Sequence, residues 1–399
     1  MKRFVSRGAR SFSSDPLANL YVDKQLKHFT PGLLNTTPRV RQTLLVDFGS
    51  RDPQFREVVK ESNRLLLEIN GLDTKKYTSV FVQGAGTYAL EAALGSIVPR
   101  KSPYKLLILA NGQYGWRQEQ IAQYLELNYE TLNFEEDEIL EPEKVYKHVA
   151  AHPEITHVSM VHHETMASLM NPVHDIADAV HQAAGSKKEV KVFVDAMSTY
   201  GCYPVDMEKH KIHYVATSPN KAIHGHAGIG AVVAELDTLN QTQGYGRSLC
   251  LDLYAQHAWF QKTGLYRFSP PTNLHRAFLE AMRELQEEGG IAARRAKYEQ
   301  MHQTLTEGLK ALGFKEFQDK EQCCLVVTMR SPKNPNFQFQ ALYDFLYSRG
   351  KAISPVELNI PGTFRVGTIG NLSLQDARDF IQDVKDALAH MGVTEPLYY

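Results

Sequence analysis

Three polar features that could do chemistry each follow a short apolar run: Asp195 after Val192-Phe193-Val194, Lys221 after 212–216, and Gly84-Ala85-Gly86-Thr87 after Phe81-Val82-Gln83. A lysine amine can form a Schiff base with an aldehyde, and a carboxylate can keep a pyridine nitrogen protonated. A glycine turn at the start of a helix can bind a phosphate dianion. Together these groups predict a site for pyridoxal 5'-phosphate (PLP), with Lys221 and Asp195 as its catalytic residues.

The glycine turn has other interpretations when it is taken alone. Gly84-Ala85-Gly86-Thr87-Tyr88-Ala89 fits the GxGxxA pattern of dinucleotide-binding proteins, which also need an acidic residue at the end of the next strand. The next apolar run, 105–109, ends in Ala110-Asn111-Gly112. The missing acid counts against NAD, and a tight turn without a ligand is the third possibility.

Asp195 and Lys221 are not decisive alone either. An aspartate can cap a following turn, and most lysines are solvated. Ser218-Pro219-Asn220-Lys221 matches the SxxK motif of serine acylases, whose partner motifs SDN and KTG are absent. Lys221 nevertheless lies between an apolar run and the glycine-rich segment 225–230. Such a weakly polar setting lowers the pKa of an amine and makes it a better nucleophile.

Other polar residues fall within or after apolar runs. His162, His163 and Glu164 follow one run and should reach the same cleft, but their spacing is weak evidence for a metal, and we expect none. Arg365 lies in Thr363-Phe364-Arg365-Val366-Gly367. It either forms a structural salt bridge or binds a substrate carboxylate or phosphonate.

The elements that position these residues alternate between 79 and 236, which predicts an α/β fold with a mostly parallel sheet. Expected strands are 80–82, 105–109, 157–161, 190–194, 214–217 and 229–233, and expected helices include 88–98, 116–127 and 173–184. Ligands of such sheets bind at the C-terminal ends of the strands, where the three features lie.

We expect a large PLP-binding domain over 15–290, including an N-terminal segment, and a smaller α+β domain over 291–399. A helical region over 273–312 is expected to break near Gly289-Gly290. Beyond it, the pattern predicts a strand at 324–329, a helix at 338–348, a strand at 363–366 and a helix at 374–390.

Composition limits the partners and the compartment. The 399 residues carry a net charge of −1 and contain no long apolar run, so we expect neither nucleic acid nor a membrane as a partner. Four cysteines without a CxxC pair indicate a reducing compartment. Residues 1–14 are rich in arginine and serine and lack acids, as in a mitochondrial transit peptide. We therefore expect the mitochondrial matrix in a eukaryote, and otherwise the cytoplasm.

Over about residues 29–388, the chain resembles the 2-aminoethylphosphonate–pyruvate transaminases, a branch of the class V PLP-dependent aminotransferases. Besides the segments around Gly84, Asp195, Lys221 and Arg365, the resemblance rests on Phe29-Thr30-Pro31-Gly32, Gly49-Ser50-Arg51-Asp52, Asn111-Gly112-Gln113-Tyr114-Gly115, Arg247-Ser248-Leu249-Cys250-Leu251-Asp252-Leu253 and Arg267-Phe268-Ser269-Pro270-Pro271-Thr272.

The resemblance implies a fold type I transferase that moves the amino group of 2-aminoethylphosphonate to pyruvate by ping-pong chemistry, giving phosphonoacetaldehyde and L-alanine. Lys221 would form the Schiff base and move the proton, and Asp195 would pair with the pyridinium. The other implied contacts are with the cofactor (Ala85, Gly86, Thr87, Thr165 and Ser218), with the partner subunit's cofactor (Thr272) and with the substrate anion (Arg365). The role of Thr272 implies a homodimer with sites at the subunit interface.

The chain departs from the family mainly on the substrate side. Met166-Ala167-Ser168 replaces T-T-G, Glu357 stands where the family has lysine, and Ala85 stands where it usually has serine. A phosphonate dianion would be repelled by Glu357 if that residue lines the site. Three alternatives stay open: another class V aminotransferase of the alanine–glyoxylate or serine–pyruvate type, a nucleotide-binding dehydrogenase, and a catalytically silent dimeric binding protein.

Overall fold

The computed structural model describes residues 26–101, 103–136, 138–186, 188–317, 323–354, 362–393 and 397. The predicted leader over 1–14 and Glu357 lie outside the described residues.

The large domain is built on a seven-stranded sheet, in which only β10 runs antiparallel to its neighbours. The order across the sheet is β2 (Tyr77–Gln83), β10 (Ile229–Glu235), β9 (Tyr214–Thr217), β8 (Lys191–Asp195), β5 (His157–Val161), β3 (Leu106–Ala110) and β4 (Tyr129–Asn133). All six predicted strands are present, and the mostly parallel α/β sheet is confirmed. Strand β4 was not predicted, because this edge strand is only half-buried and therefore lacks an apolar run.

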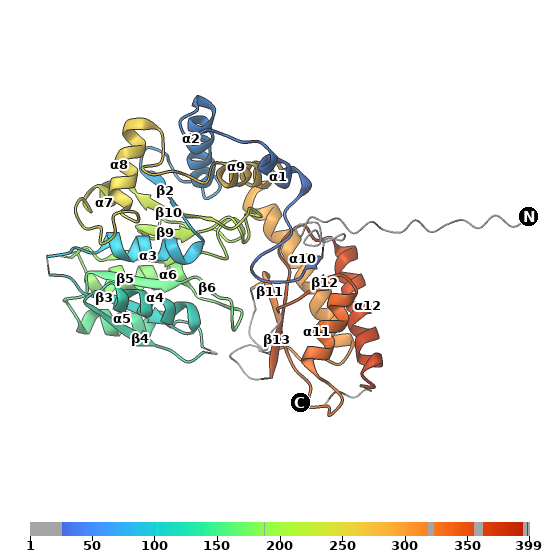
Figure 1. The fold of residues 1–399 in the computed structure, drawn as a ribbon. Coiled ribbons are helices and arrows are strands. Elements are labelled where there is room, and N and C mark those ends of the chain that lie inside the picture. Colours follow the sequence, from blue (N-terminus) through green and yellow to red (C-terminus); the bar gives the residue numbers. More distant parts are fainter. Residues whose placement is uncertain are drawn as a thin grey trace, which may run out of the picture.

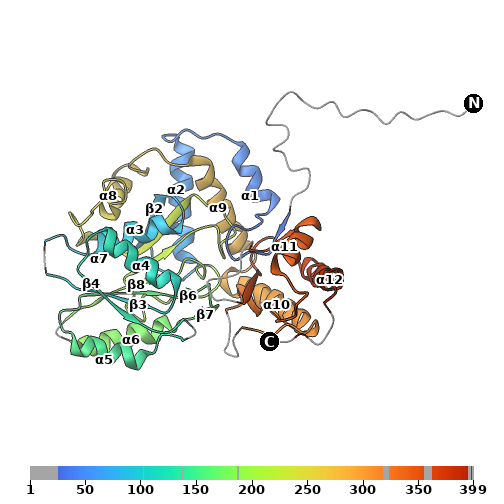
Figure 2. The ribbon, with the colours of Figure 1, turned by 60° about the horizontal axis from the view of Figure 1, so that its bottom comes forward.

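Helices cover both faces of this sheet (Figure 2). One layer contains α3 (Gly86–Ile97), α4 (Gln113–Tyr124), α7 (Leu236–Asn240) and α8 (Leu253–Thr263), and the other contains α2 (Pro53–Glu68), α5 (Pro142–Ala151), α6 (Val173–Ala184) and α9 (Thr272–Glu287). Alternate strand residues supply the two cores, as when Val80 and Val82 pack under α3 and Phe81 packs on the α9 side. Helix α4 begins and ends three residues before the predicted helix 116–127.

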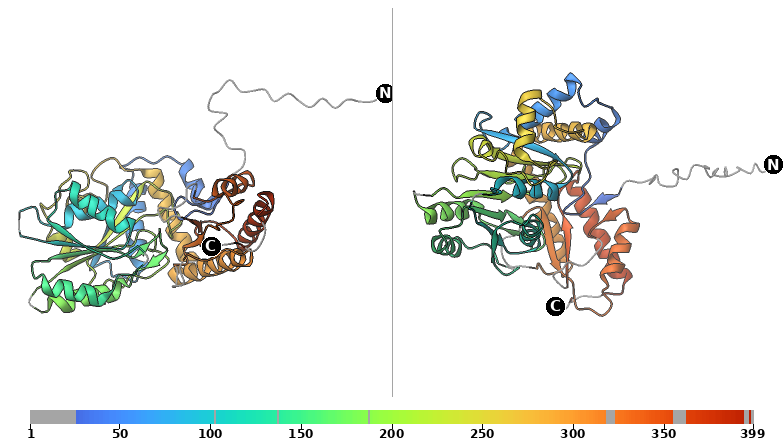
Figure 3. Two further views of the ribbon diagram at one scale, coloured as in Figure 1. Left: turned by 90° about the horizontal axis from the view of Figure 1, so that it is seen from below. Right: turned by 60° about the vertical axis from the view of Figure 1, so that its left-hand side comes forward.

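The small domain packs α10 (Gly290–Ala311), α11 (Phe339–Ser348) and α12 (Leu374–His390) against the antiparallel pair β11 (Val326–Arg330) and β13 (Thr363–Gly367). The expected break before α10 falls at Gly289, whose φ of 108° favours glycine. Strand β1 (Lys27–His28) pairs with β12 (Lys351–Ala352). In Figure 3 the start of the described chain accordingly lies beside the small domain. The boundary at residue 290 stays a prediction.

Short elements complete the chain: α1 (Pro38–Gln42), the 3-10 helix η2 (Thr43–Leu45), and the hairpin of β6 (His163–Glu164) and β7 (Leu169–Met170). The two domains stand side by side, with the hairpin turned toward the small one (Figure 1). Among the residues that the structure describes, no helix combines the length and the apolar composition needed to span a bilayer.

Candidate active site

The candidate site lies at the edge of the sheet where the parallel strands end. Because β2, β5, β8 and β9 point the same way, their C-terminal ends meet there. They carry the turn 84–87, the hairpin segment 162–168, Asp195 and Lys221. The small domain adds Arg365, whose Nη1 donates to the Thr165 carbonyl oxygen at 3.2 Å. The fold therefore gathers four separate segments and one residue of the small domain at one site.

Lys221 follows the end of β9 in a short loop that is closed by a 2.7 Å hydrogen bond from Gly225 N–H to the Pro219 carbonyl oxygen. Its Nζ donates to the Pro31 carbonyl oxygen at 3.0 Å. Burial lowers the pKa of Lys221 to about 8, with the charge of Arg365 acting in the same direction and that of Asp195 against it. A large fraction of this amine is therefore neutral, and so nucleophilic, slightly above neutral pH.

Asp195 is the last residue of β8 and is almost fully buried. One carboxylate oxygen accepts the Met197 backbone N–H at 2.9 Å, so Asp195 does cap the following turn. That bond does not offset its burial, which raises the pKa of the carboxyl to about 6. A cationic partner at the same place would stabilise the ionised form, and this is what a pyridinium nitrogen supplies.

The turn after β2 leads directly into α3. Gly84 has a φ of 111°, and Ala85 is the N-cap of the helix without a side-chain cap, so the first amides of α3 are left for another acceptor. A Cβ on Gly86 would lie 2.4 Å from the Met197 sulfur. The turn thus packs against the residue that contacts Asp195. Ala85 is half-buried and Thr87 is exposed.

Several polar atoms in the cleft are buried and have no hydrogen-bond partner among the described residues: Ser218 Oγ, Glu164 Oε2, His163 Nε2 and Arg365 Nε. Unsatisfied buried groups are rare in folded proteins and call for an explanation. A phosphate dianion would accept from the Ser218 hydroxyl and the first amides of α3, and a pyridinium would pair with Asp195. The residues present therefore fit PLP.

Arg365 lies on β13 and has no carboxylate within 4.0 Å in the part of the chain that the structure describes. This argues against the structural salt bridge. Burial lowers the pKa of the guanidinium. Its Nε has no partner among the residues that the structure describes, so the group has donor capacity left for a bound anion.

Glu164 has a role that the sequence did not reveal. Its Oε1 accepts the backbone N–H groups of Tyr114 at 2.7 Å and Gly115 at 3.1 Å, which fixes the start of α4. Burial raises the pKa of Glu164 to about 8. Arg117 lies 5.0 Å above the Tyr114 ring, and its positive charge favours the ionised forms of Glu164 and Asp195. The motif Asn111-Gly112-Gln113-Tyr114-Gly115 was the available signal, but no role could be read from it.

The histidines do not behave alike. His162, His163 and His224 are buried, and each has partners: His162 with Thr199, His163 with Ser198, and His224 with Tyr298 and Gly370. The charges of Lys221 and Arg365 act on His163, which therefore belongs to the cleft. His162 packs near Tyr203 instead, so our expectation that both reach the cleft is wrong for His162. None of these residues joins a group of three potential metal ligands among the described side chains.

Thr272 is the first residue of α9, and its hydroxyl donates to the side chain of Asn273 at 3.2 Å. No hydrogen bond among the described residues connects its side chain with the turn 84–87. Its predicted contact involves a second subunit and stays a prediction.

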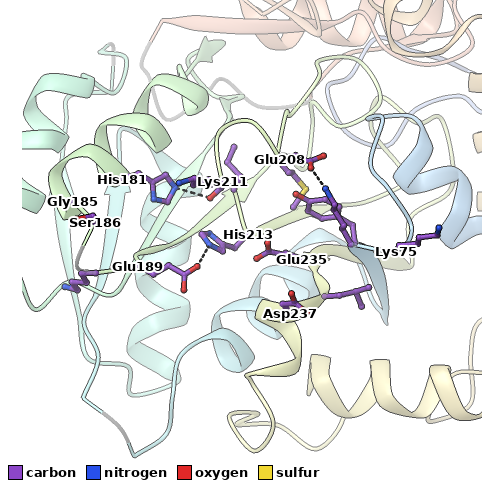
Figure 4. Close-up of a pocket in the computed structure, with 16 residues that line it drawn as sticks. Lys75, His181, Gly185, Ser186, Glu189, Glu208, Lys211, His213, Glu235 and Asp237 are labelled. Atoms are coloured by element: carbon purple, nitrogen blue, oxygen red, sulfur yellow. Dashed lines mark hydrogen bonds and ion pairs between the residues drawn. The ribbon is translucent and has the colours of Figure 1, made fainter.

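A cavity of about 670 Å³ lies at the opposite edge of the sheet, where β2 and β9 begin (Figure 4). Its lining residues include the ion pair Lys76–Glu208 and the pair His213–Glu189, in which burial lowers the pKa of His213 to about 4. None of the predicted site residues lines it. Cavity volume alone would therefore point to the wrong place for the candidate active site.

Comparison with known proteins decides the family. Residues 58–353 match the aminotransferase class V family model. The chain belongs to the class V aminotransferases. It is 38% identical over 358 residues to a 2-aminoethylphosphonate–pyruvate transaminase of Phocaeicola vulgatus, covering 89% of this chain and 97% of the relative. It is 37% identical over 386 residues to one of Syntrophobacter fumaroxidans, covering 96% and 99%.

Solved structures agree on the fold. An alanine–glyoxylate aminotransferase from Nostoc sp. superposes with a TM-score of 0.82 at 20% identity, covering 92% of this chain and 96% of that one. The predicted fold and family resemblance are confirmed, and the protein is a PLP-dependent aminotransferase. The dehydrogenase and the silent binding protein are excluded as its function.

Proposed function

We propose that this aminotransferase moves the amino group of 2-aminoethylphosphonate to pyruvate and releases phosphonoacetaldehyde and L-alanine. The observation that carries the proposal is Arg365, a half-buried guanidinium whose Nε has no partner among the described residues and whose charge acts on Lys221. A substrate with an anion at one end and an amine at the other fits this arrangement. The curated relatives that match most of the chain bear the name of this reaction.

The residues of the chain divide the work of the reaction. PLP, when it is bound, supplies the electron sink that stabilises negative charge on the amine-bearing carbon. Lys221 Nζ would take the proton from that carbon and donate it to the cofactor carbon that receives the amino group, and its lowered pKa leaves the amine able to accept the proton. Asp195 would keep the ring nitrogen protonated. Ser218 and the first amides of α3 would hold the phosphate.

Arg365 orients both substrates. The amino donor carries a phosphonate and the acceptor carries a carboxylate, and both are anions that a guanidinium can bind through paired hydrogen bonds. One anion clamp can therefore serve the two half-reactions in turn, as a ping-pong scheme requires. Fixing the anion places the amine for attack and reduces the entropy lost in the reaction.

A homodimer is part of the proposal. Tyr88, Leu249 and Phe268 are 54%, 67% and 41% exposed, which is unusual for large apolar side chains. Tyr88 and Phe268 line a mainly apolar cavity of about 380 Å³ beside the turn 84–87, together with Cys250 and Leu251. A second copy over this surface would cover it and would bring its own Thr272 toward the cofactor phosphate. If the holoenzyme sedimented as a monomer at micromolar concentration, the proposed homodimer would be contradicted.

We also propose that residues 1–14 direct the protein to the mitochondrial matrix in a eukaryotic host. Their arginine-rich and acid-free composition supports this. Fusion of these residues to a fluorescent reporter tests it, since a reporter that stays in the cytosol would contradict it.

The reaction is tested by comparing amino donors. L-Alanine formation from pyruvate should be fastest with 2-aminoethylphosphonate among the primary amines offered. The segment Met166-Ala167-Ser168 favours a second candidate, an alanine–glyoxylate type enzyme, because it departs from the phosphonate branch beside Thr165. Faster transamination of glyoxylate by L-alanine, with no use of the phosphonate, would establish that candidate instead.

A further inference from the structure

A cluster of three potential metal ligands lies away from the active site. Glu130 is on β4, His148 is in the last turn of α5, and His152 caps the C-terminal end of that helix. One ligand atom from each lies within 4.8 Å of the other two. Glu130 is the second residue of its strand, so the cluster lies toward the edge of the sheet opposite Lys221. Neither the family nor the proposed reaction gives it a role.

The two histidines have the spacing of a chelating pair. They are four residues apart, His148 in the last turn of α5 and His152 at its C-cap, and their ring centroids lie 4.2 Å apart with 24° between the planes. Because an imidazole binds a metal in its own plane, one ring must turn out of this stack before both can bind one ion. His152 Nδ1 lies 2.7 Å from the His148 carbonyl oxygen, which can only accept a hydrogen bond. Nδ1 therefore carries the proton, and the lone pair of Nε2 is left for a metal. Such a bond on the second nitrogen is how proteins orient histidine ligands.

Glu130 supplies the third ligand from another element. Its Oε1 lies 2.8 Å from His148 Nε2, and its Oε2 lies 3.2 Å from Lys105 Nζ. Two ligand atoms bound to one tetrahedral Zn²⁺ are about 3.3 Å apart, given bonds of about 2.0 Å. An ion could thus replace the proton between His148 and Glu130 with a shift of about half an ångström.

We propose that Glu130, His148 and His152 bind a divalent transition-metal ion, for which Zn²⁺ is the best match to two imidazoles and one carboxylate. All three side chains are half-buried, so water can take the fourth position. The ion would tie the C-terminal end of α5 to the edge strand β4. The cluster lies near the N-terminal ends of the parallel strands, whereas the candidate active site lies at their C-terminal ends. We therefore assign the metal a structural role.

Lys105 limits the affinity. Its ammonium holds the second oxygen of Glu130 and would repel an ion bound to the first. The site should therefore bind more weakly than one in which the carboxylate has no cation beside it. Replacing this lysine provides a change that leaves all three ligands in place.

A second stacked pair in the same chain serves as a control. The rings of His174 and His210 stack at 4.5 Å and 24°, and Asp178 lies 2.9 Å from His210 Nδ1. However, His174 Nε2 accepts the Asp206 backbone N–H at 3.0 Å, so its lone pair is already used. The second pair resembles the first in composition and stacking but cannot offer the same ligands.

The test is calorimetric titration of the dialysed holoenzyme with ZnCl₂. The wild type should bind one Zn²⁺ per chain. The His148→Gln/His152→Gln variant should bind Zn²⁺ about 100-fold more weakly or worse, because both imidazoles are gone. His174→Gln/His210→Gln should keep it, and Lys105→Gln should tighten it about fivefold, since a neighbouring positive charge is removed. Bound Cu²⁺ should show coupling to two nitrogens in its electron paramagnetic resonance spectrum.

Equal Zn²⁺ stoichiometry and affinity in the wild type and in the His148→Gln/His152→Gln variant would overturn the proposal. An unchanged or weakened affinity in Lys105→Gln would overturn it as well, and this variant does not depend on removing a ligand. Circular dichroism establishes that each variant is folded. The transaminase activity need not be known for any of these results.

Discussion

Arg365→Ala tests how the enzyme recognises the anionic end of its substrates. The wild-type guanidinium donates to the Thr165 carbonyl oxygen and interacts with the Tyr114 side chain, and its buried Nε has no partner among the described residues. The variant removes a charge-assisted contact to the substrate anion, and such contacts contribute about 1.5–3 kcal/mol. Since about 1.4 kcal/mol is a factor of ten, kcat/KM for 2-aminoethylphosphonate should fall about 10- to 150-fold.

The assay is the half-reaction without a keto acid, followed through the visible absorbance of the bound cofactor. n-Propylamine, which has no anion, is the comparison amine, and its kcat/KM should stay within about threefold of wild type because it makes no contact with the guanidinium. Arg330→Ala is a matched control, because Arg330 lies on the neighbouring strand β11 and donates to the Phe317 carbonyl oxygen on the surface. It should behave as wild type with both amines.

The same variant should alter the pH dependence. Burial is the main cause of the lowered pKa of Lys221, and the charge of Arg365 lowers it further. Without that charge the pKa rises above about 8, so a higher pH is needed to obtain the neutral amine. Unchanged kcat/KM for the phosphonate, or equal losses for the two amines, would refute the role of Arg365 as an anion clamp.

Three further predictions concern the cofactor. Lys221→Ala should abolish turnover while the variant remains folded, and measurable steady-state transamination would contradict its role. Gly86→Ala should weaken PLP binding about tenfold, because the new Cβ would displace Met197. Fluorescence titration with PLP measures this affinity, which should recover in part in the double variant Gly86→Ala/Met197→Ala. PLP capture by the apoenzyme should speed up as pH rises through about 8, because the neutral form of Lys221 reacts. Asp195→Asn removes the charge that raises this pKa, so the midpoint should move to lower pH, and a fixed midpoint would count against their coupling.

The local chemistry could be predicted from the sequence because it sits at the ends of buried strands. A run such as Val192-Phe193-Val194 marks a central parallel strand, and the polar residue after it must lie at the ligand-binding edge. The same reasoning located Lys221 and the turn 84–87. Strand β4 could not be predicted in this way, because Glu130 and its neighbours are half-buried at the edge of the sheet and form no apolar run.

Contacts between distant segments could not be predicted in this way. Lys221 donates a hydrogen bond to the carbonyl oxygen of Pro31, 190 residues away in the sequence. Arg365 donates one to the carbonyl oxygen of Thr165, 200 residues away. Glu164 fixes the start of α4 through two backbone amides, which explains why this helix begins three residues earlier than its own periodicity indicates. These contacts depend on tertiary packing, for which local sequence patterns carry no signal.

The visible absorption spectrum of the purified protein tests whether 2-aminoethylphosphonate is the amino donor and pyruvate the acceptor. It should be recorded before and after 2-aminoethylphosphonate is added without a keto acid, and again after pyruvate. We expect a cofactor band that bleaches with the phosphonate and returns with pyruvate. A band that ignores the phosphonate but bleaches with L-alanine would contradict the proposed amino donor and would point to Met166-Ala167-Ser168 as the segment that changed it.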